Sequence, residues 1–409
     1  MIWEDIRGLD QAQVYRGNEL IGHIERTAHG AIFEFGPDEK PGETAGLGFR
    51  MPANQPRYEV TGVNLHPFFA GLIPEGRRLS ALLDRVKTSA DDLFSLCLAA
   101  GPDSIGDVAL VLPGSGPKAG GSHVDLDKLE KHSFAALFER SLEFAGEGPA
   151  LEPSLPGVQD KISASMISFP LRGRKNSGTH ILKLNPKDKA SLVDNEAFFM
   201  GMARACGIET AEARIVHDRD GNKGLLVRRF DRLPDLPNKT FIKVHVEDAC
   251  QFLDRYPAEK YRLSLAAIAD GIEELATAPL VELLRLMKLV AFSYLVGNGD
   301  LHARNISLWV EPQSGRVELS PAYDLLSTLP YGDRRMALKL DGRDDSLTRS
   351  HFVSFAERRG LRPAALHAML DKLCEKSKPW RDKLETIGLT QRKTQDLQRV
   401  MTKRLGDLG

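Results

Sequence analysis

The chain has 409 residues, of which 42% are hydrophobic and 27% are charged, and its formal net charge is -1. This size and composition favour a globular protein of two to three domains. The charge indicates no polyanionic partner, although a local basic patch would escape a bulk count. The opening MIWEDIRGLD lacks the regions of a secretory signal, and no apolar run approaches the ~20 residues of a membrane span. We therefore expect a cytoplasmic protein without a membrane segment.

Strand signals come first along the chain. AQVYRGNELIGHIERT (12–27), with a turn at 16–18, and AIFEFGP (31–37) predict short strands. Helical pieces follow in 64–86 and in DDLFSLCLAAG (91–101), which ends at a glycine suited to a helix C-terminus. The Gly/Pro/Ser-rich stretch LPGSGPKAGGS (112–122) is the best candidate for a domain boundary.

The middle of the chain mixes strands and helices. THILKLN (179–185) and GLLVRRFD (224–231) predict strands. Between them, DNEAFFMGMARACG (194–207) predicts a helix with Asp194 as its N-cap and Gly207 as its stop.

From about residue 245 onward, helical patterns dominate. The stretch 279–299 begins with a proline, is apolar around much of its circumference and ends at Gly297, which suits a buried central helix. ISLWV and RVELS then predict a hairpin around Gly315, and roughly the last 60 residues return to amphipathic helix.

The four cysteines, Cys97, Cys206, Cys250 and Cys374, are widely spaced, and none forms a C-x-x-C pair. This spacing argues against zinc or a disulfide framework. We expect buried, reduced thiols.

The segment GNGDLHARNISLWV (297–310) places Asp300, His302 and Asn305 within six residues. Magnesium on a nucleotide needs few protein oxygens, because it keeps water and takes phosphate oxygens. Asn305 can supply one such oxygen, while Asp300 can orient a hydroxyl nucleophile and take its proton, as in protein kinases. The segment therefore predicts phosphoryl transfer if a second metal ligand exists. For His302, a structural contact with the backbone and a direct phosphate contact both stay open.

The second ligand is expected in SPAYDLLS (320–327), because the hairpin would bring Asp324 back near Asn305; a simple N-cap of a following turn is the alternative. In HILKLNP, Lys183 stands among apolar strand residues, and an unpaired buried lysine is unfavourable. A phosphate and the carboxylate of Glu196 could compensate it, as in the strand-lysine to helix-glutamate pair of kinases. A lysine at a sheet edge that reaches solvent would also fit.

The loop PSLPGVQDKISAS (153–165) offers a Pro/Gly turn before an alternating strand. Gly157 would let the backbone approach an anion closely, and the polar Gln159 and Lys161 follow it. An ordinary turn would look the same.

Together these stretches resemble the HipA family, the serine/threonine kinase toxins of bacterial toxin–antitoxin modules. FFAGLIPEG and LFSLCLAAGPDSIGDVAL resemble the family's amino-terminal domain. Seven stretches resemble its kinase portion, in the family's order: SLPGVQDK, HILKLNP, DNEAFFMGMARACGI, VRRFDR, HVEDACQFLDRYPAEKY, GNGDLHARNISL and SPAYDLLST. The resemblance implies an α+β, protein-kinase-like fold with a β-rich amino-terminal domain (1–115), a nucleotide-binding region like a kinase N-lobe (123–245) and a mainly helical carboxyl-terminal lobe with the catalytic loop (246–409).

The resemblance also implies roles for individual residues, with ATP and Mg²⁺ as cofactors. Asp300 would be the catalytic base, Asn305 and Asp324 would hold magnesium, and Lys183, supported by Glu196, would contact the ATP phosphates. The other implied ATP contacts are a loop (Pro156, Gly157, Val158, Gln159, Asp160 and Lys161), a hinge (Glu247, Asp248 and Ala249), His302 and Tyr323.

Ser154 matches the serine whose autophosphorylation in this family ejects the phosphate loop and switches the kinase off. Such a switch is physically sensible, because a phosphoserine carries about -1.5 to -2 charge and would be repelled by bound phosphates. Two departures from the family pattern concern regulation and rate: Pro156 stiffens the loop, and Gly299 and Leu301 replace polar neighbours of Asp300.

The resemblance suggests an aminoacyl-tRNA synthetase as substrate, glutamyl-tRNA synthetase being the known type. It also suggests a small HipB-like helix-turn-helix antitoxin as partner, with operator DNA bound through it.

Two rival functions fit parts of the sequence. One is a kinase of small molecules with a related fold, which the active-site residues alone do not exclude. The other is a transcriptional co-repressor with weak catalysis, for which a basic carboxyl-terminal series could contact DNA. Acidic residues are interspersed in this series, which favours a solvated helix surface instead. The series is Lys376, Lys378, Arg381, Lys383, Arg392, Lys393, Arg399, Lys403 and Arg404.

Overall fold

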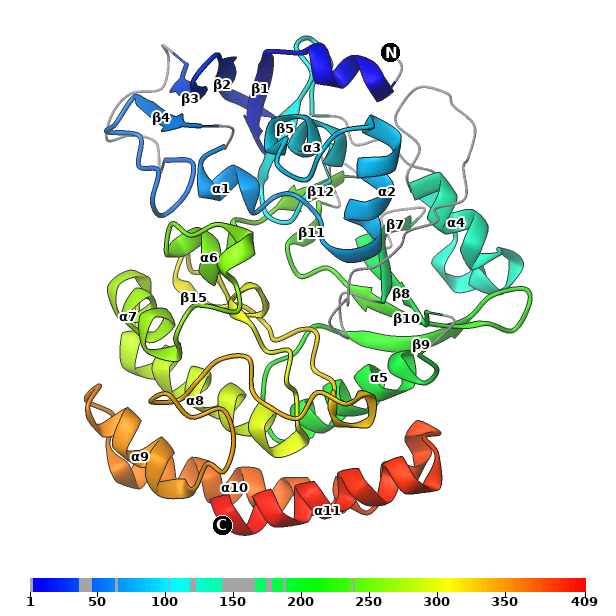
Figure 1. Cartoon of the computed structure of the whole chain (residues 1–409), viewed down its shortest axis with the longest axis vertical. Coiled ribbons are helices and arrows are strands. Elements are labelled where there is room, and N and C mark those ends of the chain that lie inside the picture. Colours follow the sequence, from blue (N-terminus) through cyan, green and yellow to red (C-terminus); the bar gives the residue numbers. More distant parts are fainter. Residues whose placement is uncertain are drawn as a thin grey trace.

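The computed structural model describes residues 3–36, 46–62, 65–101, 103–117, 123–141, 166–173, 179–186, 189–235, 237 and 240–409. The molecule is elongated and has three tiers: a sheet at the amino-terminal end, a second sheet in the middle and a layer of helices at the carboxyl-terminal end (Figure 1). The α+β architecture expected from the sequence is confirmed.

The first tier is an antiparallel sheet with three helices packed beneath it. The turn predicted at residues 16–18 is present, with Gly17 at φ +60°, where glycine avoids the strain of a side chain. In spatial order the strands are β4 (Arg57–Thr61), β3 (Gly30–Phe35), β2 (Glu19–Thr27), β1 (Gln11–Arg16) and β5 (Val108–Val111). The helices are α1 (Pro67–Ala70), α2 (Gly76–Val86) and α3 (Leu93–Ala100), which stops at Gly101 as predicted.

The second tier is a mixed sheet with α4 (Phe134–Ser141) and α5 (Leu192–Ala205) packed against it. Its strand order is β6 (His123–Val124), β7 (Ile167–Gly173), β8 (Thr179–Leu184), β10 (Lys223–Arg228) and β9 (Ala213–His217). Both strands predicted in this region are present. The short ribbon β11 (Arg232–Asp235) and β12 (Thr240–Lys243) follows.

The N-cap predicted for α5, Asp194, was wrong by three residues, since Ser191 stands at that position. The helix begins at Leu192, after Ser191 in the left-handed region at φ +66°. The side chain of Asn185 accepts the Val193 amide at 2.9 Å and so supplies the cap. Asp194 instead pairs with Lys223 of the neighbouring sheet at 2.7 Å.

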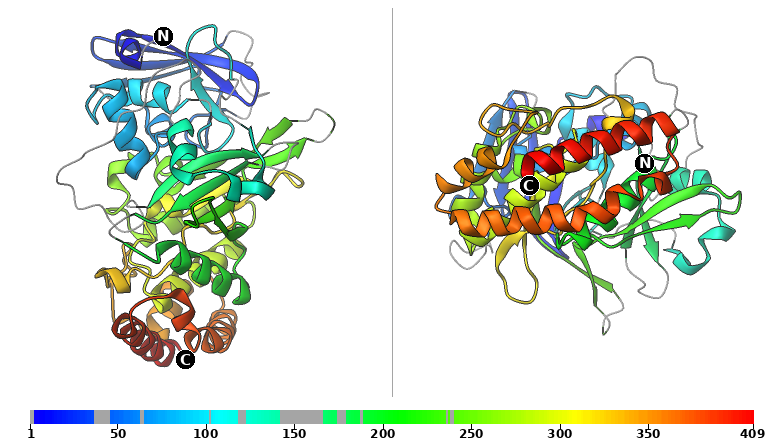
Figure 2. Two further views of the ribbon diagram at one scale, coloured as in Figure 1. Left: turned by 90° about the vertical axis from the view of Figure 1, so that its right-hand side faces the viewer. Right: turned by 90° about the horizontal axis from the view of Figure 1, so that it is seen from below.

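The third tier is built around the buried helix α8 (Pro279–Val296), which begins with a proline and ends at Gly297 as predicted. Around it lie α6 (Ala249–Phe252), α7 (Leu265–Leu275), α9 (Arg349–Glu357), α10 (Pro363–Arg381) and α11 (Gln391–Leu408). A small antiparallel sheet, β13 (Val246–Asp248), β14 (Ser307–Val310) and β15 (Val317–Leu319), contains the predicted hairpin. Figure 2 shows α10 and α11 side by side across the end of the molecule.

Short 3₁₀ helices complete the chain at Trp3–Gly8, Leu126–Lys131, Pro257–Glu259, Ala303–Asn305, Leu329–Tyr331 and Leu384–Ile387. In the described part of the chain no helix is both long enough and apolar enough to cross a membrane. The four cysteines are buried and free, as expected. The predicted domain limits stay a prediction.

One member of the basic carboxyl-terminal series is not a surface residue. Arg404 is buried, pairs with Asp345 at 2.9 Å and donates a hydrogen bond to the Tyr294 carbonyl at 2.5 Å. Its guanidinium therefore fixes α11 to α8 and is not available to DNA.

Candidate active site

A cavity with about 1220 Å³ of empty space, part of it open to solvent, lies where the three tiers meet. The first tier contributes the loop of residues 71–76 together with Arg78, Asp103, Ser104 and Ile105. The second contributes β7 and Ile181 of β8. The third contributes Asp248, Gln251, His302, Arg304, Asn305, Ser307, Tyr323 and Asp324. The amino-terminal domain is therefore part of the cavity wall, which the sequence did not predict.

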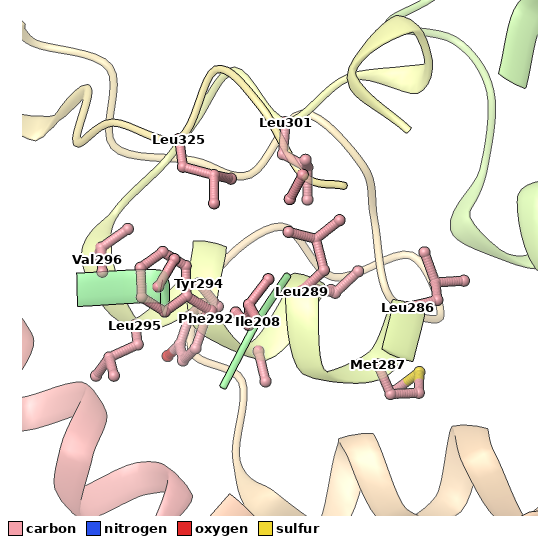
Figure 3. Packing of buried hydrophobic residues seen from close by; sticks show 14 of the residues in the cluster. Ile208, Leu286, Met287, Leu289, Phe292, Tyr294, Leu295, Val296, Leu301 and Leu325 are labelled. Carbon is pink, nitrogen blue, oxygen red and sulfur yellow. The ribbon is translucent and has the colours of Figure 1, made fainter. Parts of the chain in front are cut away.

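Asp300 and Asn305 are held together by their own loop. The Asn305 amide nitrogen donates to the Asp300 carbonyl at 2.9 Å, and the Asp300 amide donates to the Asn298 side chain at 3.0 Å. The next residue, Leu301, is 2% exposed and packs into the core around α8 (Figure 3). Because its nitrogen is engaged, the Asn305 side chain has its oxygen left to offer to a cation.

Asp324 is anchored in a similar way. Its backbone is left-handed at φ +56°, an uncommon conformation for a residue other than glycine. Leu325, directly after it, is fully buried and lies near Leu301 above α8 (Figure 3). Asp300 and Asp324 are thus each followed by a leucine that is buried in the core, and this leucine fixes the position of the acidic residue before it.

Lys183 of β8 contacts two carboxylates. Its Nζ lies 2.6 Å from Oε1 of Glu196 on α5 and also pairs with Asp324. Burial by itself lowers the pKa of Lys183, but the two carboxylates raise it above its ordinary value, so the ammonium stays charged. Burial raises the pKa of Glu196 to about 7. The lysine–glutamate pair predicted from the sequence is present.

Asn305 and Asp324 fit a magnesium–nucleotide. Both line the cavity and both present oxygen ligands, which is the donor type that magnesium prefers. Over the described ranges, no group of three or more His, Cys, Asp or Glu side chains is arranged to hold a metal alone. Phosphate and water would have to complete the coordination, as in nucleotide-bound magnesium.

The predicted hinge reaches the cavity at one residue only. Asp248 lines the cavity, and its carboxylate caps α6. Glu247 turns away and accepts hydrogen bonds from the Phe49 amide at 2.6 Å and from His245 at 2.9 Å. The Ala249 amide donates to the Ile306 carbonyl at 2.9 Å. The structure does not bring Glu247 or Ala249 into the described cavity wall.

His245 links this hinge to the amino-terminal domain. Its Nδ1 lies 2.9 Å from Asp107 and its Nε2 lies 2.9 Å from Glu247. Burial lowers the pKa of an imidazole, but here the two carboxylates outweigh it and raise the pKa of His245 to about 9. The buried imidazolium therefore joins two parts of the protein.

His302 and Tyr323 both line the cavity, as expected. His302 is 2% exposed, burial lowers its pKa, and its Nδ1 has no hydrogen-bond partner among the described residues. The Tyr323 hydroxyl donates to the Arg304 carbonyl at 2.8 Å. The Nδ1 of His302 is also shielded from solvent, so the two roles expected for His302 both stay open.

Four charged or polar side chains around Asp300 were not singled out from the sequence. The Tyr261 hydroxyl donates to Oδ1 of Asp300 at 2.7 Å. Glu75 lies 2.7 Å from Lys260 and 3.0 Å from Arg304, and Arg304 lies 2.8 Å from Asp248. Burial opposes the ionisation of Glu75, but Arg304 and Lys260 lower its pKa to about 2. The motifs FFAGLIPEG and HVEDACQFLDRYPAEKY contain Glu75, Lys260 and Tyr261, and Arg304 lies inside the catalytic segment itself.

The predicted phosphate loop cannot be placed. Ser154, Pro156, Gly157, Val158, Gln159, Asp160 and Lys161 lie outside the described residues.

Two family models match the chain. Residues 12–111 match the HipA N-terminal domain, and residues 153–380 match the HipA-like C-terminal domain. The second match alone covers more than half of the chain.

Curated relatives and a solved structure agree with this match. "Putative kinase Y4dM" of Sinorhizobium fredii is 32% identical over 65% of this chain and 63% of its own length. "Serine/threonine-protein kinase toxin HipA" of Shewanella oneidensis is 27% identical over 70% of this chain and 68% of its own length. The chain thus spans about two thirds of the length of these relatives.

The fold is that of HipA from Shewanella oneidensis MR-1, solved as a complex of HipA, HipB and operator DNA. The TM-score is 0.70 at 21% identity, and the match covers 97% of this chain and 96% of that one.

Proposed function

Because this chain belongs to the HipA family, we propose that it is an ATP-dependent serine/threonine protein kinase and the toxin of a bacterial toxin–antitoxin pair. The observation that carries the proposal is that Asn305 and Asp324 line one cavity. Buried Asp300 is held against Asn305 by a hydrogen bond, and the Lys183–Glu196 pair is joined to Asp324. These are the groups that phosphoryl transfer needs, at the positions that kinases use.

In this proposal Asp300 accepts the proton of a serine or threonine hydroxyl as that oxygen bonds to the γ-phosphorus of ATP. The bond between the γ-phosphorus and the β–γ bridging oxygen breaks, and ADP leaves. Lys183 pairs with the phosphates, and Asn305 and Asp324 hold the magnesium. When bound, the magnesium neutralises charge on the phosphate oxygens. Asp324 is paired with Lys183 through one carboxylate oxygen, and this carboxylate would also be the one that holds the metal. His302 lines the same cavity and would contact a phosphate directly, which is one of the two roles expected for it.

Catalysis then comes from positioning and from electrostatic stabilisation of the moving phosphoryl group. Asp300 and Asp324 each precede a buried leucine, Leu301 and Leu325, which holds the backbone at that position in the core. Of the hinge, Asp248 would lie nearest the adenine, since it lines the cavity and Glu247 and Ala249 do not.

The substrate and the partners follow from family membership. We propose an aminoacyl-tRNA synthetase, of the glutamyl-tRNA synthetase type, as the protein that is phosphorylated. We also propose a HipB-like helix-turn-helix antitoxin as partner, with operator DNA bound through it, because the Shewanella protein was solved with HipB and operator DNA. The loop that contains Pro156 and Lys161 would cover the nucleotide, and phosphorylation of Ser154 would expel it. A cytoplasmic location is part of the same proposal.

The test is to incubate the purified protein with ATP labelled on the γ-phosphate and a proteome extract. Labelled protein bands are expected, and Asp300→Asn should lower the labelling about a thousandfold, because a general base contributes on that order. Asp270→Asn is the matched control, since this exposed carboxylate pairs only at the surface with Arg359. Labelling of small molecules without any protein band would favour the small-molecule kinase instead.

A further inference from the structure

The loop of residues 71–76, in the amino-terminal domain, holds the side chain of Arg304. Arg304 lies between Asp300 and Asn305 in the catalytic segment. Its guanidinium donates to the Gly71 carbonyl at 2.7 Å and pairs with the Glu75 carboxylate at 3.0 Å. The remaining nitrogen contacts Asp248 at 2.8 Å. Arg304 is thus fixed from one side by the amino-terminal domain and from the other by the hinge.

Glu75 also reaches the opposite flank of the catalytic segment. Its carboxylate pairs with Lys260 at 2.7 Å, and the carbonyl of Lys260 accepts the Ala303 amide at 3.1 Å. The residue after Lys260 is Tyr261, whose hydroxyl donates to Asp300 at 2.7 Å. One carboxylate therefore connects, through two cations, to both sides of the loop that contains Asp300 and Asn305.

We propose that Glu75 is a positioning residue of the kinase site, and that the amino-terminal domain is for this reason a structural part of that site. Glu75 lines the cavity, and in this proposal it acts on the reaction through Arg304 and Lys260. This inference rests on the proposed function where it concerns catalysis, but the ordering of residues 298–306 by Glu75 can be measured without any activity.

A second ion pair between the same two parts of the molecule provides a comparison. Arg50 of the amino-terminal domain contacts Glu274 of α7 with both of its terminal nitrogens, at 2.6 and 2.7 Å. This pair stabilises the same docking of the amino-terminal domain, and neither residue has a described contact with the catalytic segment. Removing this pair tests whether a general weakening of the interface is enough to loosen residues 298–306.

The experiment compares hydrogen–deuterium exchange of the full chain with Glu75→Gln and with Glu274→Gln. In E75Q, the amides of residues 298–306 should exchange at least about threefold faster than in the wild type, because a segment opens more often when contacts that hold it are lost. In E274Q, their exchange rate should equal that of the wild type. The inference is overturned if the exchange rate at 298–306 is the same in E75Q as in the wild type. It is also overturned if E274Q raises that rate as much as E75Q does. If E75Q does not fold, Glu75→Asp, which keeps the charge on a shorter side chain, is judged by the same two criteria.

Phosphorylation rates separate this inference from the proposed function. E75Q should lower kcat about tenfold, since a loop misplaced by a fraction of an ångström slows transfer, and E75D should recover part of the rate. Tyr261→Phe should lower kcat by a smaller factor in the E75Q background than in the wild type, because both changes act on the same segment. Strictly additive losses overturn the inference. A wild type that phosphorylates nothing, with exchange at 298–306 still raised in E75Q, refutes only the proposed function.

Discussion

The Tyr261 hydroxyl lies 2.7 Å from Oδ1 of Asp300 and donates its proton to that oxygen. The same ring packs edge-on against His302, with ring centroids 5.0 Å apart. The proton of this phenol is retained, because burial and the Asp300 charge raise the pKa of Tyr261 above its ordinary value. Tyr261 therefore fixes the orientation of one carboxylate oxygen of the proposed base.

Tyr261→Phe removes this hydrogen bond and keeps the ring. We expect kcat to fall about tenfold with a KM for ATP changed less than about twofold, because the change affects the orientation of the base and not the nucleotide. Initial rates at varied ATP measure both. Tyr15→Phe, whose hydroxyl is 3.5 Å from the Gln13 side chain in the distant sheet, is the control. A raised KM with an unchanged kcat would contradict this role.

Lys183→Met should lower both stability and ATP binding. Without the ammonium, Glu196 is left buried and unpaired, which destabilises by about 3 to 5 kcal/mol. Adding Glu196→Gln should restore most of the free energy of unfolding and none of the ATP affinity. Denaturant unfolding and calorimetric titration of ATP measure these two quantities.

The matched control for this change is Lys223→Met. Lys223 pairs with Asp194 of the same helix, but it is half-exposed, so its loss should change stability by less than about 1 kcal/mol. If Lys183→Met combined with Glu196→Gln is no more stable than Lys183→Met alone, the unpaired carboxylate of Glu196 is not the cause of the destabilisation.

His245 should make stability depend on pH in the alkaline range. Its pKa is about 9 in the folded protein, compared with 6.5 ordinarily, so folding favours the protonated form. The stabilisation is complete below about pH 6.5, declines as the pH rises and is lost above about pH 9, in total about 3 kcal/mol. Denaturant unfolding across this range measures it.

The variant His245→Gln should lack this decline between about pH 6.5 and 9, since it cannot titrate. His217→Gln, at an exposed position on β9, should keep it. Parallel stability curves for the wild type and His245→Gln would rule out the imidazolium as the link between Asp107 and Glu247.

Ser154→Ala should remove the main site of self-phosphorylation, which family resemblance assigns to this serine. Phosphopeptide mapping after incubation with ATP is the measurement, and Ser165→Ala, in the same stretch, is the control. An unchanged phosphopeptide pattern in Ser154→Ala would refute the assignment.

The contacts among the candidate site residues could be predicted because their relationships are local. Asp300 and Asn305 share one short segment, and the hairpin of β14 and β15 determines where the chain returns with Asp324. The Lys183–Glu196 pair joins a strand to the next helix, which are near neighbours in sequence. Patterns over such short separations define contacts without knowledge of how the domains dock.

The residues that the sequence did not indicate depend on docking. Glu75 and Lys260 are 185 positions apart, and Phe49 and Glu247 are 198 apart. The sequence around one residue of such a pair does not indicate which distant residue it will contact. The side chain of Glu247 turns from the cavity because an amide and an imidazole from outside its strand satisfy it, which strand periodicity does not reveal.

The cavity wall has a consequence for inhibitor design. Ile73, Ser104 and Ile105 of the amino-terminal domain line the same space as Asp324 and Asn305, and Ile105 is 51% exposed. A compound that occupies the nucleotide region and extends an apolar group onto Ile105 would contact a surface with no counterpart in kinases that lack this domain. Selectivity against kinases without this domain would then come from it, even where the catalytic groups themselves are shared.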